Sequence, residues 1–447
     1  MLIFKFVKSQ LMKKKILDLN GEIKNYAVNT GWIFLDKLIK LSFGFFVYIY
    51  LTRYLGPYNL GVLAYSQTII AIFVAISTLG LTNGGILLKN LVEGKNKSTT
   101  LLGTITFLTM ITSLVSIITL SIWIYFTDHE PTHTIIHILS ISIIFQNLNM
   151  IFIDYFQSIV LSKYSALAGI LSMLVSSAIK VSLIYFEASL STFAVAIIFD
   201  SFFSTTILFI FYLKYRKNIC IWDFNFTILK QFLRSAIPLT LAALSALLYT
   251  RIDQLMIKSM LGIESLGNYS IAIYLTEIFY VIPTIISFSL FTKMVELRTR
   301  SNGNYFKFLL RIYSLLVWIA LPLTILLFLL SNKIIMILYG GIYPQAGGAL
   351  KILSLCLIFN SINLISIKIL YVEGFEKKYV YRTIFGIIIN ILLNYLLIPI
   401  YGINGAAIAT VITLFSICYL YDLTDKELMK FYSLKIKCFN PRRILFI

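Results

Sequence analysis

Long apolar segments dominate this chain of 447 residues and constrain its fold more than any other feature. Twelve runs reach about 20 residues or more, the length that an α-helix needs to cross the hydrocarbon core of a bilayer. They lie near 27–52, 60–87, 101–127, 134–160, 164–187, 192–213, 236–260, 267–292, 308–330, 349–372, 380–399 and 405–421. Strands of a membrane β-barrel would be shorter and would alternate polar with apolar residues. The pattern therefore predicts an all-α integral membrane protein with twelve transmembrane helices.

Basic residues are distributed unevenly between the two predicted faces of the membrane. The chain carries 38 lysines and arginines against 19 acidic residues. With both termini in the cytoplasm, inner loops and tails hold 29 of these bases, whereas outer loops hold only Arg53 and Lys333. Such an excess on the inner side sets the orientation of membrane proteins. We therefore predict cytoplasmic termini and a basic surface that faces anionic phospholipids, not nucleic acid.

The predicted helices divide into two groups of six. The longest inner loop, residues 214–235, follows the sixth helix and would be a cytoplasmic linker between an N-terminal bundle, 27–213, and a C-terminal bundle, 236–421. A basic amphipathic segment, 1–26, and a basic tail, 422–447, would flank the bundles on the cytoplasmic side. Because six is even, both bundles start from the same side. This predicts a pseudo-twofold axis along the membrane normal.

A repeated motif supports the division into halves. The stretches RYLGPYNLG, 53–61, and LGIESLG, 261–267, both contain Leu-Gly, three residues, and Leu-Gly again. In the twelve-helix scheme both fall on the outer face, between helices one and two and between helices seven and eight. Glycine pairs suit tight turns at which two helices approach closely. The alternative is that Leu-Gly pairs are simply common in membrane turns.

Four stretches together carry a family resemblance: RYLGPYNLG, RIDQLMIKSMLGIESLGNY, YVEGFEKKYVYR and NYLLIPIYGINGAAIAT. They resemble the Wzx-type O-antigen flippases of the polysaccharide transporter family. These belong to the multidrug/oligosaccharidyl-lipid/polysaccharide (MOP) exporter superfamily. The last stretch is the most specific of the four, and the resemblance covers roughly residues 25–421.

The resemblance implies a fold and a function. The fold would be MATE-like, with two six-helix bundles around a central, partly cationic cavity. The function would be to flip undecaprenyl-pyrophosphate-linked oligosaccharide repeat units from the inner to the outer leaflet of the bacterial inner membrane by alternating access. The partners that the resemblance implies are this lipid-linked glycan and a polysaccharide polymerase with its chain-length machinery. The identity of the sugars does not transfer.

Charges inside the predicted helices are candidate functional residues, because each costs about 2.5–3.5 kcal/mol at a helix centre. Lysines and arginines facing water between the bundles could replace the hydration of a diphosphate with charge-assisted contacts. Lys258 and Lys368 lie near helix ends, where extension of the side chain to the interface is an equal explanation. The substrate-binding candidates for this cationic lumen are Lys37, Lys40, Lys180, Arg251, Lys258 and Lys368.

Helix five carries one stripe of small and hydroxylated residues that ends in Lys180. The spacing of four, three, four and four residues places the stripe on one helix face. The stripe could line the cavity, or it could be a close helix contact. Its members are Ser165, Gly169, Ser172, Ser176 and Lys180.

Five acids could couple transport to H⁺ or Na⁺, and no other cofactor is expected. On helix one, Asp36 can pair with Lys40 four residues later. Buried carboxylates can carry protons, but they can equally be neutral packing residues. The candidates are Asp36, Asp154, Asp200, Asp253 and Glu277.

One tempting catalytic motif is rejected. HEPTH, 129–133, matches the H-E-x-x-H zinc-protease pattern, but Pro131 fits only the first turn of a helix. His129 and His137 would lie about 12 Å apart along a helix, too far to share one zinc. The sequence contains no Walker A motif, so ATP is not the expected driver. We therefore predict a transporter and not an enzyme, with no metal site.

Three alternatives remain beside the flippase. A cation-coupled multidrug exporter of the same superfamily would favour an acidic binding lobe, whereas bases equal or outnumber acids in helices one, five, seven and ten. A peptidoglycan-precursor flippase typically carries two additional helices that this sequence lacks. A membrane O-antigen polymerase would need a large outer loop with basic catalytic residues, and the predicted outer loops are short.

Overall fold

The computed structural model describes residues 2–80, 98–127, 132–216, 223–300 and 302–440, and the described chain is almost entirely helical. Its first half consists of α1 Leu2–Ser77, α3 Ser98–Thr127, α4 Thr132–Ser140, α5 Ser142–Ser158, α6 Ser162–Tyr185 and α7 Leu190–Arg216. Its second half consists of α8 Phe226–Leu261, α9 Ile263–Phe279, α10 Val281–Arg300, α11 Asn302–Tyr339, α12 Ala346–Leu353, α13 Cys356–Val372, α14 Glu376–Tyr401, α15 Ile403–Phe415, the π-helix η1 Ser416–Leu420, α16 Tyr421–Leu423 and α17 Met429–Lys437.

The helices agree with the twelve predicted spans. Within the described residues, nine helical segments are long and apolar enough to cross a membrane, or ten when the bent pair α12 and α13 counts as one span. The long α1 contains the first predicted span and the greater part of the second, up to Ser77, and α8 contains the seventh. No strand occurs in the part of the chain that the structure describes.

The repeated motif forms the same turn twice. Gly56 bends α1 with φ 68° and ψ 176°, and Gly262 separates α8 from α9 with φ 91° and ψ 175°. Only glycine adopts such backbone angles without strain. Each turn starts a new helix, at Pro57 in the first half and at Ile263 in the second. We call the end of the molecule with these two turns the glycine end. The opposite end, where α10 ends after Arg298 and the first turn of α14 carries Lys377 and Lys378, we call the basic end.

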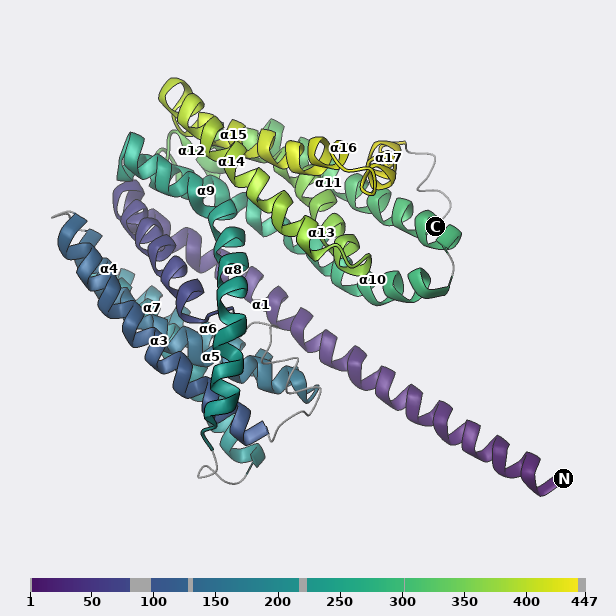
Figure 1. The fold of residues 1–447 in the computed structure, drawn as a ribbon. Coiled ribbons are helices and arrows are strands. Elements are labelled where there is room, and N and C mark those ends of the chain that lie inside the picture. The colour runs from purple at the N-terminus through teal and green to yellow at the C-terminus, as the bar shows by residue number, and fades with distance from the viewer. Residues whose placement is uncertain (1, 81–97, 128–131, 217–222, 301, 441–447) are drawn as a thin grey trace.

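The two halves lie side by side around α1 and α8. Figure 1 shows α3–α7 on one side of α1 and α10–α17 on the other, with α8 running between them. In the first half α1 packs against α6, and across the boundary it packs against α9. One large apolar core lies in the second half, and the first half has two smaller ones.

Two predicted boundaries differ from the structure. Residues 226–235 of the expected linker form the start of α8, because the Asn225 side chain caps the helix by accepting hydrogen bonds from the Thr227 and Ile228 amides at 2.9 and 3.1 Å. The expected separate segment 1–26 continues α1 from Leu2 without a break and projects beyond the bundle (Figure 1). No proline interrupts this stretch. The side chains of residues 1–27, on which its amphipathic character depends, lie outside the described part.

The tail after α16 is docked on the second half by ion pairs. Buried Lys435 of α17 contacts the Asp422 carboxylate at 2.6 Å and donates to the Cys418 carbonyl at 2.9 Å. Burial lowers the pKa of Lys435. A hydrogen bond from Lys378 lowers the pKa of Asp425, whose carboxylate lies 2.6 Å from the ammonium. The basic composition of this segment is thus used partly for internal pairing.

Candidate transport cavity

Two glycines bring the halves into backbone contact at the glycine end. A Cβ atom on Gly61 would lie 1.9 Å from the Ile263 carbonyl oxygen, and one on Gly267 would lie 1.8 Å from the Pro57 carbonyl oxygen. The contact is reciprocal, because each motif presents its second glycine to the start of the other motif's helix. We call this contact the glycine seam. It requires glycine at both positions.

Polar contacts close the same end. Arg53 of α1 donates to the carbonyls of Leu338 and Ile337, the latter at 2.8 Å, at the C-terminal end of α11. A guanidinium there satisfies orphan carbonyls and complements the helix dipole. The buried Tyr343 hydroxyl donates to the Thr52 carbonyl at 2.6 Å. The glycine end is therefore sealed by contacts between the halves.

A pocket of about 210 Å³ lies between the halves, and we call it the interface pocket. Tyr48 of α1 and Tyr274 of α9 stack there with ring centroids 3.6 Å apart. The Thr68 hydroxyl donates to the Gln254 side-chain oxygen at 2.7 Å, which is a second bridge between the halves. The lining consists of Tyr48, Ala64, Gln67, Thr68, Ala71, Arg251, Gln254, Ser270, Ile273, Tyr274 and Glu277.

Arg251 and Glu277 carry opposite charges into this pocket. Their closest nitrogen and oxygen lie 3.9 Å apart, and their side chains are 35% and 45% exposed. A half-exposed pair at this distance is weak. Both groups therefore remain accessible to a ligand in the pocket.

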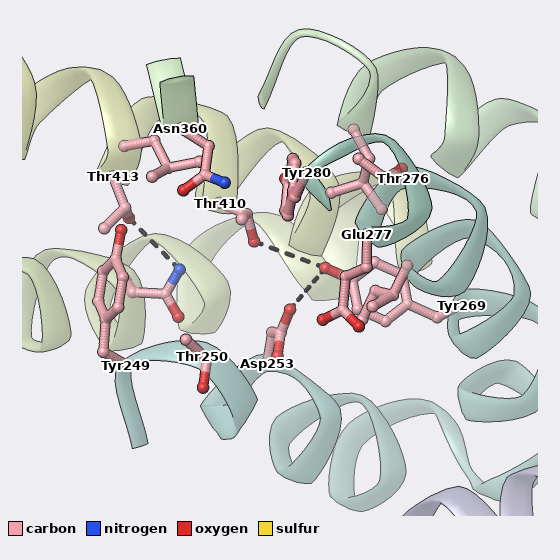
Figure 2. Close-up of a pocket in the computed structure, with 14 residues that line it drawn as sticks. Tyr249, Thr250, Asp253, Tyr269, Thr276, Glu277, Tyr280, Asn360, Thr410 and Thr413 are labelled. Atoms are coloured by element: carbon pink, nitrogen blue, oxygen red, sulfur yellow. Dashed lines mark hydrogen bonds between the residues drawn. The ribbon is translucent and has the colours of Figure 1, made fainter. Parts of the chain in front are cut away.

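A second pocket of about 110 Å³ lies wholly within the second half, and we call it the C-half pocket (Figure 2). Buried Asp253 accepts hydrogen bonds from the Tyr269 hydroxyl at 2.7 Å and from the Gln254 backbone N–H at 2.8 Å. The Tyr269 hydroxyl also lies 3.5 Å from the Thr410 hydroxyl. Glu277 lines both pockets, so the C-half pocket lies next to the interface pocket.

An amide ladder forms another wall of the C-half pocket. The Asn390 side chain donates to the Thr413 hydroxyl at 3.3 Å and accepts from Asn394 at 2.8 Å. Carboxylate, hydroxyl and amide oxygens are the ligands that small hard cations prefer. No group of three or more His, Cys, Asp or Glu residues suited to a metal occurs among the described residues.

The charges of the first half form a separate group. Lys40 and Asp36 pair at 2.9 Å, as their spacing predicts. They lie against α6 at Gly169, where a Cβ would be 2.3 Å from the Lys40 ammonium. The charge of Asp200 on α7 interacts with both Lys180 and Lys40. Lys40 thus interacts with both carboxylates, and Lys180 interacts with Asp200.

The stripe of small residues predicted on the fifth span lies on α6, and most of it does not line a cavity. Ser172 and Ser176 are 2% and 1% exposed, and Gly169 is buried. The small side chains allow α1 to pack closely on α6. Of the two interpretations, helix contact is correct for these residues.

The remaining sequence candidates lie in different places. Lys37 of α1 and Lys368 of α13 interact as like charges across the boundary between the halves, toward the basic end. Lys368 also lies 5.1 Å from the ring centroid of Phe291. Lys258 lies near the glycine end, 5.0 Å over the Tyr65 ring. Buried Asp154 is on α5 and lines neither of the two pockets.

The structure therefore groups Arg251, Asp253 and Glu277 but separates them from the other charges. The histidine motif is described only in part, because residues 128–131 lie outside the described chain; His133 and His137 are on α4. Sequence reasoning missed the neutral polar residues of both pockets. The sequence did indicate them, because amide and hydroxyl side chains are unusual within apolar spans. The residues of this kind that line the pockets are Gln67, Thr68, Asn360, Asn390, Thr410 and Thr413.

Comparisons with known proteins agree with this architecture. The family model described as polysaccharide biosynthesis protein matches residues 50–346, well over half of the chain. An uncharacterised membrane protein of Methanocaldococcus jannaschii is 27% identical over 201 residues, which cover 44% of this chain and 45% of that protein. The chain thus matches less than half the length of this relative.

Solved structures show the same fold. The lipid II flippase MurJ in an inward closed conformation superposes with a TM-score of 0.70 and 16% identity, covering 92% of this chain and 90% of that one. An inward-facing multidrug resistance MATE family transporter of the MOP superfamily gives 0.68 and 14%, covering 88% and 96%. At these identities the likeness concerns the fold alone. The chain belongs to the family of polysaccharide biosynthesis proteins, and its two helical bundles have the fold of these two solved structures.

Proposed function

We propose that this protein flips polyprenyl-diphosphate-linked oligosaccharides, with undecaprenyl as the carrier lipid, from the inner to the outer leaflet of a bacterial inner membrane. One observation carries the proposal. Lys37 of α1 in the first half and Lys368 of α13 in the second half lie close enough for their like charges to interact across the boundary. Two lysines so placed can share the charge of a diphosphate that enters between the halves.

The arrangement of the pockets supports the direction of transport. The glycine seam closes one end, and the interface pocket lies between the halves beyond it. With the basic end in the cytoplasm, closure at the glycine end would correspond to an inward-facing state that receives substrate from the inner leaflet. Exchange of the open and closed ends by rocking the halves would release substrate outside. The diphosphate would exchange its hydration for lysine contacts, and the polyprenyl chain would stay in lipid.

The C-half pocket is the proposed site of coupling to H⁺ or Na⁺. Asp253 is buried there among hydroxyl and amide groups, and Glu277 connects it to the interface pocket. Binding of a cation at Asp253 would change the net charge of the C-half pocket, next to the boundary between the two halves. The same carboxylates favour the second candidate function, a cation-coupled exporter of small organic cations.

Depletion of the protein in the producing cell tests the proposal. We expect single lipid-linked repeat units to accumulate in the cytoplasmic leaflet and surface glycan to disappear. Single units that reach the outer face without being polymerised would instead indicate a polymerase. Unchanged glycan together with new sensitivity to organic cations would favour the drug exporter.

A further inference from the structure

We propose that the interface pocket is a sugar-binding subsite that recognises the glycan. It would be distinct from the site at which the lysines bind the diphosphate. This inference rests on the proposed function, since it assigns the glycan part of the same substrate. Tyr48 and Tyr274 would form the aromatic wall of the subsite. Gln67 and Gln254 would supply hydrogen bonds to sugar hydroxyls.

The charge of the pocket favours a neutral polyhydroxylated ligand. Arg251 and Glu277 cancel in net charge and lie 3.9 Å apart. A diphosphate here would meet repulsion from the Glu277 carboxylate. A sugar hydroxyl can accept from a guanidinium and donate to a carboxylate at the same time. The pocket is therefore suited to hydroxyls and poorly suited to an anion.

The rest of the lining offers both kinds of hydrogen-bonding partner beside an aromatic surface. The Gln67 side chain is exposed, and its amide carries donors and an acceptor. The hydrogen bond from Thr68 fixes the orientation of the Gln254 amide. Tyr48 and Tyr274 stack at 3.6 Å and present one apolar wall with polar tips. A few placed polar groups beside an apolar surface are typical of ligand sites that select by shape and hydroxyl pattern.

The dimensions fit a glycan attached to a distant diphosphate. Lys37 and Tyr48 are on the same helix, about 16 Å apart along its axis. The pocket volume of about 210 Å³ corresponds to about seven water molecules, the scale of one hexose ring. A diphosphate near Lys37 would therefore place a later sugar of an oligosaccharide, not the first one, in the interface pocket.

A binding comparison with two lipids tests this subsite. Full-length protein in nanodiscs is titrated with undecaprenyl diphosphate without sugar, and with the lipid-linked glycan extracted from the depleted cells. For Gln67→Ala and Tyr48→Leu we expect at least about tenfold weaker binding of the glycan lipid, as expected from the loss of one or two ligand contacts. Binding of the sugar-free lipid should not change. Tyr48→Phe, which keeps the stack, should bind both lipids nearly as the wild type does.

Matched controls lie outside the pocket. Gln146→Ala removes an amide that bonds to Ser142 of its own helix, and Tyr185→Leu removes a tyrosine that is 83% exposed. Both should bind the two lipids normally. The subsite is refuted if Gln67→Ala and Tyr48→Leu bind the glycan lipid as the wild type does, or if they lose both lipids equally. Failure of the wild type to bind either lipid would refute the proposed function itself.

Discussion

Substitution of Gly61 by alanine should open the glycine end of this protein. The new Cβ would lie 1.9 Å from the Ile263 carbonyl oxygen, and ordinary contact begins at 3.4 Å. The halves would have to separate locally by about 1.5 Å to restore such a contact. The obstacle is backbone of the opposite helix, so a rotamer change cannot relieve it. Gly267→Ala should act in the same way, because its Cβ would lie 1.8 Å from the Pro57 carbonyl.

The expected magnitude follows from the cost of overpacking. Forcing an extra methyl group into a closed contact costs about 1–3 kcal/mol, and a backbone obstacle favours the upper end. The seam exists only when the glycine end is closed, so the cost falls on that state alone. A difference of about 3 kcal/mol changes the ratio of closed to open states by about 100-fold.

Labelling of a cysteine in the interface pocket measures this change. Gln67→Cys is introduced into a protein whose four native cysteines are replaced, and a membrane-impermeant maleimide is added from the glycine-end side. We expect slow labelling with Gly61 and strongly faster labelling with Gly61→Ala or Gly267→Ala. Gly44→Ala in the same α1 is the control, because nothing lies within 4 Å of its Cβ. Equal labelling rates in all four proteins, each folded and inserted, would refute the role of the seam.

Three further predictions concern charged groups. Arg251→Ala should abolish surface glycan at normal protein levels, whereas Lys258→Ala, whose ammonium lies 5.0 Å over a tyrosine ring near the glycine end, should have little effect; equal effects in a glycan immunoblot would contradict the assignment. Asp253→Asn should retain binding of the lipid-linked glycan but lose the dependence of transport on an H⁺ or Na⁺ gradient, which flipping into proteoliposomes with imposed gradients measures. Asp422→Ala should lower the free energy of unfolding by about 3–5 kcal/mol, because it leaves the buried Lys435 ammonium unpaired; the additional change Lys435→Met should recover much of that loss in a detergent thermal-melting assay.

Much of the fold could be predicted because membrane helices follow from local composition. The predicted apolar runs fall on helices of the described chain, nine or ten of which are long and apolar enough to span a membrane, since every backbone group in lipid must be satisfied within its own helix. The Leu-Gly repeat located both turns at the glycine end, since Gly56 and Gly262 adopt angles that other residues avoid. Gly405, Ala406 and Ala407 near the start of α15 are all buried, because small residues allow this helix to pack closely on its neighbours.

The candidate site was predictable only in part. The carboxylates and the arginine could be predicted as candidates because a charge within a membrane span is energetically costly and is therefore usually functional. Asp253, Arg251 and Glu277 meet at the pockets, but Asp154 does not. From the sequence, the serine stripe of α6 could equally line a water-filled cavity or pack against another helix, since both roles need small residues on one helix face.

The sequence by itself determined the membrane class, the twelve helices, the two equivalent halves and the turns between paired helices, because these depend on composition and local backbone preference. Only the tertiary structure decided which faces meet. It brought Gly61 into contact with Ile263 and Tyr48 into contact with Tyr274, across about two hundred residues of chain. It also buried Ser172 and Ser176 of α6 in the packing against α1. The physical reason is that periodicity fixes which residues share a helix face, while the choice between neighbour, water and lipid for that face depends on the packing of all the helices together.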